Sequence, residues 1–115
     1  MSFEPHELLR HILAEADYLL AVSATLSREQ LEDDPTLQRA IVRSIEIIGE
    51  ASKRVPTAIK EANPKVQWRS MSRMRDRLVH DYFGIDLDIV WDVVQTNIPP
   101  LRAELNRILA EQPEQ

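Results

Sequence analysis

Apolar residues recur near the start of the chain at spacings of three and four, the period of a helix that packs by one face. Pro5 stands at a position suited to a helix start, and the pattern ends near Ala24. The apolar residues of this stretch are Leu8, Leu9, Ile12, Leu13, Ala16, Leu19 and Leu20. We therefore expect a helix over residues 5–24 whose apolar face is buried in a core.

A wider apolar stripe marks residues 35–55. Asp34 suits an N-cap, Pro35 suits the first helical position, and Pro56 ends the pattern. The stripe consists of Leu37, Ile41, Ile45, Ile48 and Val55, and it is widened by Ala40, Ile47 and Ala51. Because the stripe is so broad, we expect a central helix that packs on more than one side.

Two short helical pieces are predicted on either side of this central helix. Ser27 is placed to cap a turn of helix over residues 28–32. A second piece is expected over residues 57–62, where Asn63-Pro64 ends it.

The next long helix is predicted from Trp68 to about Phe83. Gly84 favours this end, because glycine is common directly after the last helical residue. Asp86 is then placed to cap a further helix, whose apolar residues are Ile89, Val90, Trp91, Val93 and Val94.

Pro99-Pro100 is expected to interrupt the helical pattern before a last helix, which carries Leu101, Leu105, Ile108 and Leu109. Four or five antiparallel helices with short connections predict an all-α, up-and-down bundle. The length of 115 residues fits a single domain over residues 1–112, with a frayed polar tail at residues 113–115.

The composition agrees with packed helices. Gly occurs twice, aromatic residues make up 5%, and Cys is absent. A chain without Cys has no disulfides and no thiolate metal ligands, which suits a reducing cytoplasm. No apolar run reaches membrane-spanning length, and the first residues lack the basic-then-apolar order of a secretory signal. We expect a cytoplasmic protein without membrane contact.

The charge is unevenly distributed. The net charge of −5 argues against a general nucleic-acid binder, and no DNA partner is expected. Cations nevertheless concentrate between residues 53 and 77, at Lys53, Arg54, Lys60, Lys65, Arg69, Arg73, Arg75 and Arg77. These residues form either a local basic surface or an ordinary solvated helix face.

One segment, residues 74–84, combines side chains that suit chemistry on a phosphodiester. Arg75 offers a planar fork of donors that fits phosphate oxygens. His80 is the type of side chain best suited to moving protons at neutral pH, and Tyr82 adds a phenol. Cleavage of RNA without a metal needs a base, an acid and a cation near the phosphorus.

The order of these residues resembles a known family. Arg75, four residues, His80, one residue and Tyr82 match the R-x4–6-H-x-Y motif of HEPN-domain ribonucleases. The surrounding sequence, MRDRLVHDYFGID, is similar to the corresponding segment of the HepT-like toxins of that superfamily. The sequence of residues 45–51, IEIIGEA, is also similar to that family. Asn63-Pro64 before Trp68 adds to a likeness that spans almost the whole chain.

The resemblance implies a toxin of a toxin–antitoxin pair that is a homodimer and a metal-independent endoribonuclease. Arg75, His80 and Tyr82 are its implied catalytic residues. It also implies a partner, a nucleotidyltransferase antitoxin of the MNT type, which can adenylylate the motif tyrosine, here Tyr82. The acidic Asp81 between the last two motif residues would repel a phosphate and argues against the activity more than against the fold.

An ideal helix through residues 68–83 would not bring the three motif side chains together. Arg75 and Tyr82 are seven residues apart and share a face, whereas His80 lies about 140° away. Either the helix distorts before Gly84, or two subunits assemble the site around a two-fold axis. The second alternative would bring two histidines to one cleft, one as base and one as acid.

Each motif residue also has a purely structural interpretation. Arg75 could be buried and paired with Glu46 or Glu50 of the central helix. His80 could be favoured by the negative end of a helix, and Tyr82 could bury its ring and satisfy its hydroxyl.

A second hypothesis for the function of the whole chain is a catalytically inactive docking subunit of a nucleotidyltransferase complex.

Other polar residues suggest less chemistry. Arg69, Arg73 and Arg77 are candidates for RNA binding. Most of the charged residues of the central helix are interpreted as an intrahelical ladder, in which Glu46 and Glu50 share a stripe with Arg39, Arg43 and Lys53 or Arg54. His6 and His11 are five residues apart, which is the wrong spacing for a shared metal face, so no metal is expected. No Gly-rich loop is present to hold a nucleotide cofactor, so none is expected.

Overall fold

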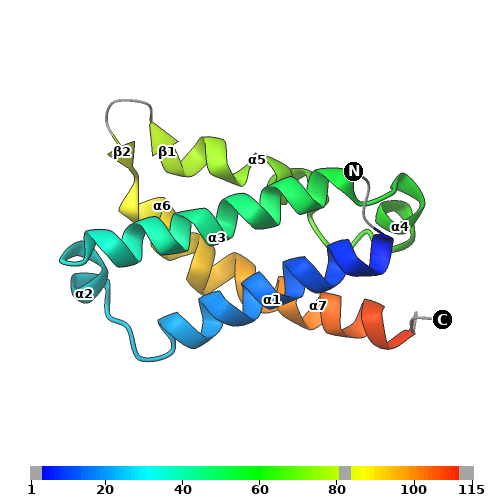
Figure 1. The fold of residues 1–115 in the computed structure, drawn as a ribbon, viewed down its shortest axis with the longest axis horizontal. Helices are drawn as coiled ribbons and strands as arrows, with labels where there is room; N and C mark the ends of the chain where they lie inside the picture. The colour runs from blue at the N-terminus through cyan, green and yellow to red at the C-terminus, as the bar shows by residue number, and fades with distance from the viewer. Residues whose placement is uncertain (1–3, 81–83, 112–115) are drawn as a thin grey trace.

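The structure is a computed structural model that describes residues 4–80 and 84–111, with residues 79 and 80 described by their backbone. The tail at residues 113–115 lies outside these ranges. The long helices, which lie side by side in Figure 1, are α1 (Pro5–Ser23), α3 (Pro35–Arg54), α5 (Trp68–Leu78) and α7 (Ile98–Glu111). The shorter elements are α2 (Arg28–Glu32), α4 (Thr57–Ala62), β1 (Val79–His80), β2 (Gly84–Ile85), α6 (Leu87–Asp92) and a π-helical turn, η2 (Val93–Asn97). The predicted all-α bundle is confirmed.

Helix α3 is the central helix of the bundle, as its broad apolar stripe predicts. Figure 1 shows α3 running between α5 and α1, and its most extensive contacts are with those two helices. Asp34 caps its start, because the Asp34 side chain accepts a 2.9 Å hydrogen bond from the Leu37 backbone N–H. Ile41, Ile45 and Ile48 are almost fully buried. Side chains from both neighbouring helices therefore enclose this stripe.

Gly49 brings α3 and α5 into backbone contact. A Cβ atom at Gly49 would lie 3.1 Å from the carbonyl oxygen of Met71 and 3.6 Å from that of Ser72. The missing side chain thus allows α5 to lie directly on α3. On this side of the bundle α5 buries its apolar residues, which are Trp68, Met71, Met74 and Leu78.

The start of α5 is held by polar contacts to the preceding loop and to α7. The indole N–H of Trp68 donates to the backbone oxygen of Asn63 at 3.0 Å. The Asn63 side chain donates to the Ile59 oxygen at 2.9 Å and accepts from Nη2 of Arg107 at 3.1 Å. Arg107 also donates to Glu104 of its own helix, and this hydrogen bond raises the pKa of Arg107. The entry point of α5 is therefore fastened from two directions.

The expected interruption at Pro99-Pro100 is wrong. Helices α6 and α7 are joined without a break by η2, and both prolines lie in the first turn of α7. Proline has no N–H, so the carbonyls one turn earlier lose their usual α-helical donors. The chain widens into a π turn at that point, where the Ile98 N–H donates to the Val93 oxygen.

None of the helices in the described ranges is both long and apolar enough to span a bilayer.

The contact at Gly49 can be tested by filling it. We expect Gly49→Leu to destabilise the fold by about 1–3 kcal/mol, because a side chain at this position has to push α5 away. Thermal unfolding followed by circular dichroism would measure the change, and each kcal/mol lowers the midpoint by roughly 4–8 °C in a small domain.

Arg39→Leu is the matched control, since it places the same side chain at an exposed position of α3. Its effect should stay within about 0.5 kcal/mol. Equal midpoints for the two variants would contradict the role given to Gly49.

Candidate active site

Helix α5 ends before the motif does. The helix was expected to continue to about Phe83, and this expectation is wrong, because α5 stops at Leu78. Val79 and His80 instead form an antiparallel ladder in which Val79 pairs with Ile85 and His80 with Gly84. The Asp86 N–H closes this end by donating to the Leu78 oxygen at 2.7 Å.

Gly84 has a different role from the one its position suggests. Its φ of +78° lies in the left-handed region that glycine tolerates, as in a residue that follows a helix. In the structure, however, this conformation begins β2, which returns the chain antiparallel to β1. Gly84 therefore allows the chain to begin β2, and it does not end α5.

This helix end bears on the first of the two geometric alternatives for the motif, and the assembly by two subunits stays a prediction. Arg75 lies in the last turn of α5, whereas the backbone of His80 lies beyond the helix, in β1. The helix therefore distorts before Gly84, and the 140° separation expected for an ideal helix does not apply. Tyr82 lies outside the described residues, so its predicted role and its possible burial stay predictions.

Arg75 is paired across the helix interface, as one interpretation of the sequence predicts. Its Nε donates to Oε2 of Glu46 in α3 at 2.6 Å. The expectation that Arg75 is buried is wrong, because 54% of its side chain is exposed, against 25% for Glu46. An exposed ion pair stabilises a fold by only about 0–1 kcal/mol. The pair therefore orients the guanidinium group more than it stabilises the bundle.

A groove of about 360 Å³ lies between α3 and α5 around this ion pair. The residues that line it are Arg43, Glu46, Gly49, Glu50, Lys53, Ser72, Arg75 and Asp76. The lining thus contains three cationic and three acidic side chains. A phosphate placed here would have guanidinium and ammonium donors within the same groove. We call this the Arg75 groove.

The sequence did not predict that Arg43 and Lys53 line this groove. It assigned both to a charge ladder along α3, and one rung is present, since Lys53 pairs with Glu50 at 3.4 Å. Glu46 pairs instead with α5, so the ladder interpretation is wrong for this residue. The signal that could have revealed the groove is Gly49, which marks a close approach on the same helix.

Arg69, Arg73 and Arg77 do not line the Arg75 groove. All three are exposed on α5. On an α-helix Arg73 projects about 160° away from Arg75, so this basic stripe is on another face of α5. Their predicted contact with RNA stays a prediction, and the cations close to Arg75 come from α3.

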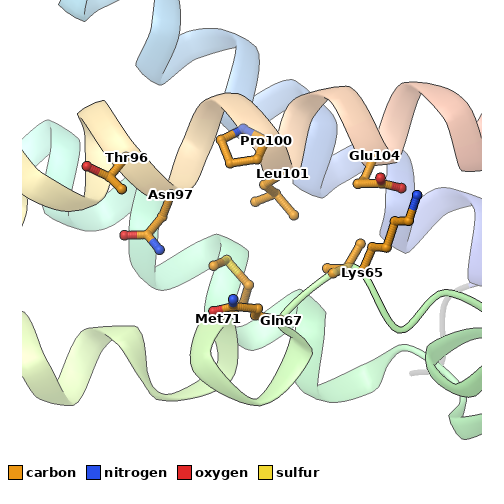
Figure 2. A pocket seen from close by; sticks show the side chains of 9 residues that line it. Lys65, Gln67, Met71, Thr96, Asn97, Pro100, Leu101 and Glu104 are labelled. Carbon is orange, nitrogen blue, oxygen red and sulfur yellow. The ribbon is translucent and has the colours of Figure 1, made fainter.

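A separate hollow of about 210 Å³ lies between the start of α5 and the η2–α7 segment. Figure 2 shows Thr96 and Asn97 at one end of it and Lys65 and Glu104 at the other, with Met71 on the α5 side. Arg75, the motif residue whose side chain the structure describes, is not among the residues that line it. This hollow is therefore distinct from the Arg75 groove.

In the described ranges, no three His, Asp or Glu residues are grouped closely enough to hold a metal ion. The acidic residues of the Arg75 groove are Glu46, Glu50 and Asp76, and Glu46 and Glu50 already pair with cations. The groove suits an anion with oxygen acceptors better than it suits a cation.

Comparison with known proteins agrees with this arrangement. Residues 12–108 match the family model described as ribonuclease HepT-like. The chain belongs to the HepT-like ribonuclease family. The matched range includes α3, α5, the paired strands β1 and β2, and most of α7. It therefore contains every element that forms the Arg75 groove.

Several HepT-like relatives are assigned as candidate ribonucleases. One from Caldanaerobacter subterraneus subsp. tengcongensis is 41% identical over 108 residues, which is 94% of this chain and 96% of the relative. A candidate ribonuclease HepT from Thermococcus cleftensis is 44% identical over 75 residues, 65% of this chain and 68% of the relative. One from Methanocaldococcus jannaschii is 34% identical over 103 residues, 90% of this chain and 85% of the relative. No solved structure gives a significant match.

The backbone of Gly84 gives a prediction for the ladder that carries His80. We expect Gly84→Ala to destabilise the fold by about 1 kcal/mol, because alanine tolerates a φ of +78° poorly. Among the described residues, none would lie within 4 Å of a Cβ atom here, so we attribute the cost to the backbone.

Gly84→Asn is the matched comparison, because asparagine adopts the left-handed region more readily than alanine does. Chemical denaturation should therefore rank the stabilities as Gly, then Asn, then Ala. A variant with Asn less stable than the one with Ala would show that side-chain bulk, and not φ, is limiting.

Proposed function

We propose that this HepT-like chain is the toxin of a toxin–antitoxin pair and a metal-independent endoribonuclease. The observation that carries the proposal is the Arg75–Glu46 ion pair, which orients the motif arginine in its groove. Arg75 stands four residues before the start of β1 and five residues before His80. The candidate ribonucleases among the relatives support the same reaction class.

The proposed reaction is an internal transfer at the scissile phosphate. A base takes the proton of the 2′-hydroxyl, and the 2′-oxygen then attacks the phosphorus. The 5′-oxygen leaves with a proton from an acid, so the products are a 2′,3′-cyclic phosphate and a 5′-hydroxyl. His80 supplies the proton transfer, and Arg75 stabilises the charge on the phosphoryl oxygens. Tyr82 completes the proposed catalytic set.

Glu46 has a positioning role in this proposal. A guanidinium group on an exposed side chain would otherwise sample many rotamers, and the 2.6 Å contact from Nε to Glu46 limits them. A carboxylate that holds Nε thus fixes the direction in which the guanidinium group meets a substrate phosphate.

The proposed assembly is a homodimer in which the two motifs meet near a two-fold axis. A two-fold interface brings the same surface of each chain face to face. Two copies of His80 in one cleft would allow one to act as base and the other as acid. The chain acts in the cytoplasm in this proposal, on RNA.

The proposed antitoxin is a nucleotidyltransferase of the MNT type that adenylylates Tyr82. In that step the phenolic oxygen of Tyr82 attacks the α-phosphorus of ATP, the phenolic proton is lost, and pyrophosphate leaves. The bulky anionic group then occupies the end of the motif and repels the phosphate of an RNA substrate.

Cleavage of RNA in excess EDTA is the first test of the proposed reaction. We expect the purified chain, free of its partner, to cut total RNA or a tRNA pool and to leave 2′,3′-cyclic phosphate ends. His80→Ala and Arg75→Ala should each lower the rate by at least about a hundredfold, in line with the loss of one acid–base or electrostatic group.

The alternative function, an inactive docking subunit, predicts a different result. A folded and unmodified dimer that cuts neither RNA preparation, but still binds a nucleotidyltransferase, would exclude the ribonuclease. Activity that disappears with EDTA and returns with a divalent ion would instead exclude the metal-independent mechanism.

Modification of Tyr82 is tested separately by co-expression with an MNT-type nucleotidyltransferase. We expect intact-mass spectrometry to show the addition of AMP to the wild-type chain and none to Tyr82→Phe. Tyr18 is 38% exposed and is the other tyrosine of the chain, so Tyr18→Phe is the matched control and should still be modified. AMP on the Tyr82→Phe chain would place the acceptor elsewhere.

A further inference from the structure

A second hollow lies beside the Arg75 groove, on the flank of α3 that faces α1. It measures about 240 Å³ and lies between α1 and α3. Its lining residues are Leu8, His11, Arg43, Ile47, Glu50, Ala51 and Arg54. We call it the His11 hollow, after the residue that α1 contributes to its polar rim.

The His11 hollow and the Arg75 groove share part of their walls. Arg43 and Glu50 of α3 line both of them. Figure 1 shows α3 between α1 and α5, so the two depressions flank the same exposed stretch of α3. A chain-like ligand bound at Arg75 can therefore cross α3 and reach His11 without leaving the surface that these residues line.

The lining of the His11 hollow suits a nucleotide unit. Leu8 and Ala51 are buried and form an apolar floor against which a sugar or base can pack. His11, Arg43 and Arg54 place donors around this floor, against one carboxylate, Glu50. The combination of an apolar floor and a cationic rim fits a sugar–phosphate unit better than it fits a free inorganic anion.

The two arginines of the hollow are available to an anion. Among the described residues neither Arg43 nor Arg54 forms a salt bridge. By contrast, Arg28, Arg102 and Arg107 are each paired with a carboxylate. Binding a phosphate at Arg43 and Arg54 therefore breaks no ion pair within the described part of the fold.

We propose that the His11 hollow binds a phosphate of the RNA strand next to the scissile one, so that the substrate crosses α3 from Arg75 to His11. The inference rests on the proposed function for its substrate class. It assigns Arg54 and His11 as substrate-binding residues and predicts that the enzyme distinguishes longer RNA from a dinucleotide. The exposed stripe at Arg69, Arg73 and Arg77 is not needed for this path.

The path is tested by binding, with cleavage removed. In a His80→Ala background, fluorescence anisotropy would measure the affinity for a labelled single-stranded oligoribonucleotide across a salt series. We expect Arg54→Gln to weaken binding about fivefold and to reduce the slope of log K against log salt by about 0.7, as for the loss of one phosphate contact on a single strand.

Arg39→Gln is the matched control. It removes the same charge from the same helix, at an exposed position outside both depressions. Its effect on affinity should be less than twofold. In the otherwise wild-type enzyme, Arg54→Gln should slow cleavage of the oligonucleotide and leave cleavage of a dinucleotide, which spans only the scissile phosphate, unchanged.

Several outcomes would overturn the path. Equal losses from Arg54→Gln and Arg39→Gln would show attraction by overall charge and no defined subsite. An equal loss of dinucleotide cleavage would place Arg54 in the reaction and not along the strand. If Arg54→Gln fails to fold, by its thermal unfolding curve, His11→Gln tests the hollow from α1, and unchanged oligonucleotide binding there would exclude it.

The binding test can fail or succeed independently of the proposed ribonuclease activity. Arg54-dependent binding by a chain whose wild-type form cuts no RNA would exclude the ribonuclease and keep the subsite. Cleavage by wild type with no Arg54 dependence would do the reverse.

Discussion

The backbone contact between α3 and α5 at Gly49 is the constraint on which the rest of the site depends. It sets the distance between the two helices, and that distance brings Glu46 within hydrogen-bonding reach of Arg75. The same spacing leaves the depression whose floor includes Gly49. A bulkier residue would separate the helices and open the ion pair, although neither charged residue would have changed. Packing at a residue without a side chain thus determines the position of the charges.

Polar contacts then refine a position that apolar burial has already fixed. Trp68, Met74 and Leu78 anchor α5 in the core, and the Trp68 indole is hydrogen-bonded to the loop before it. The Arg75–Glu46 pair adds little stability because both side chains retain contact with solvent. Its value is orientation. The bundle supplies rigidity, and the exposed pair orients the guanidinium group at its surface.

Much of the fold could be predicted from local signals, because α1 and α3 have long amphipathic stripes and recognisable caps. The predictions failed where the decisive interactions are not local. Nothing in the sequence before Gly84 indicates that Val79 pairs with Ile85, since a two-residue ladder has no periodicity to detect. The prolines at the start of α7 indicated a break in the helix, whereas a π-helical turn before them keeps the helix continuous. In the site, Glu46 was one of the two carboxylates that the sequence offered as a partner for Arg75. The contribution of Arg43 and Lys53 could not be predicted, because it depends on the arrangement of the helices in space.

The end of α5 at Leu78 has a consequence for the spacing of the motif. Were Arg75 and His80 both on one helix, adding a single residue between them would rotate one by about 100° relative to the other. Here the arginine belongs to a helix and the histidine to an extended segment held by its partner strand. One or two residues added at the junction between Leu78 and Val79 would leave Arg75 at its place on the helix and His80 paired with Gly84. Variable spacing between the two residues, as the R-x4–6-H pattern allows, is then an expected property of the architecture.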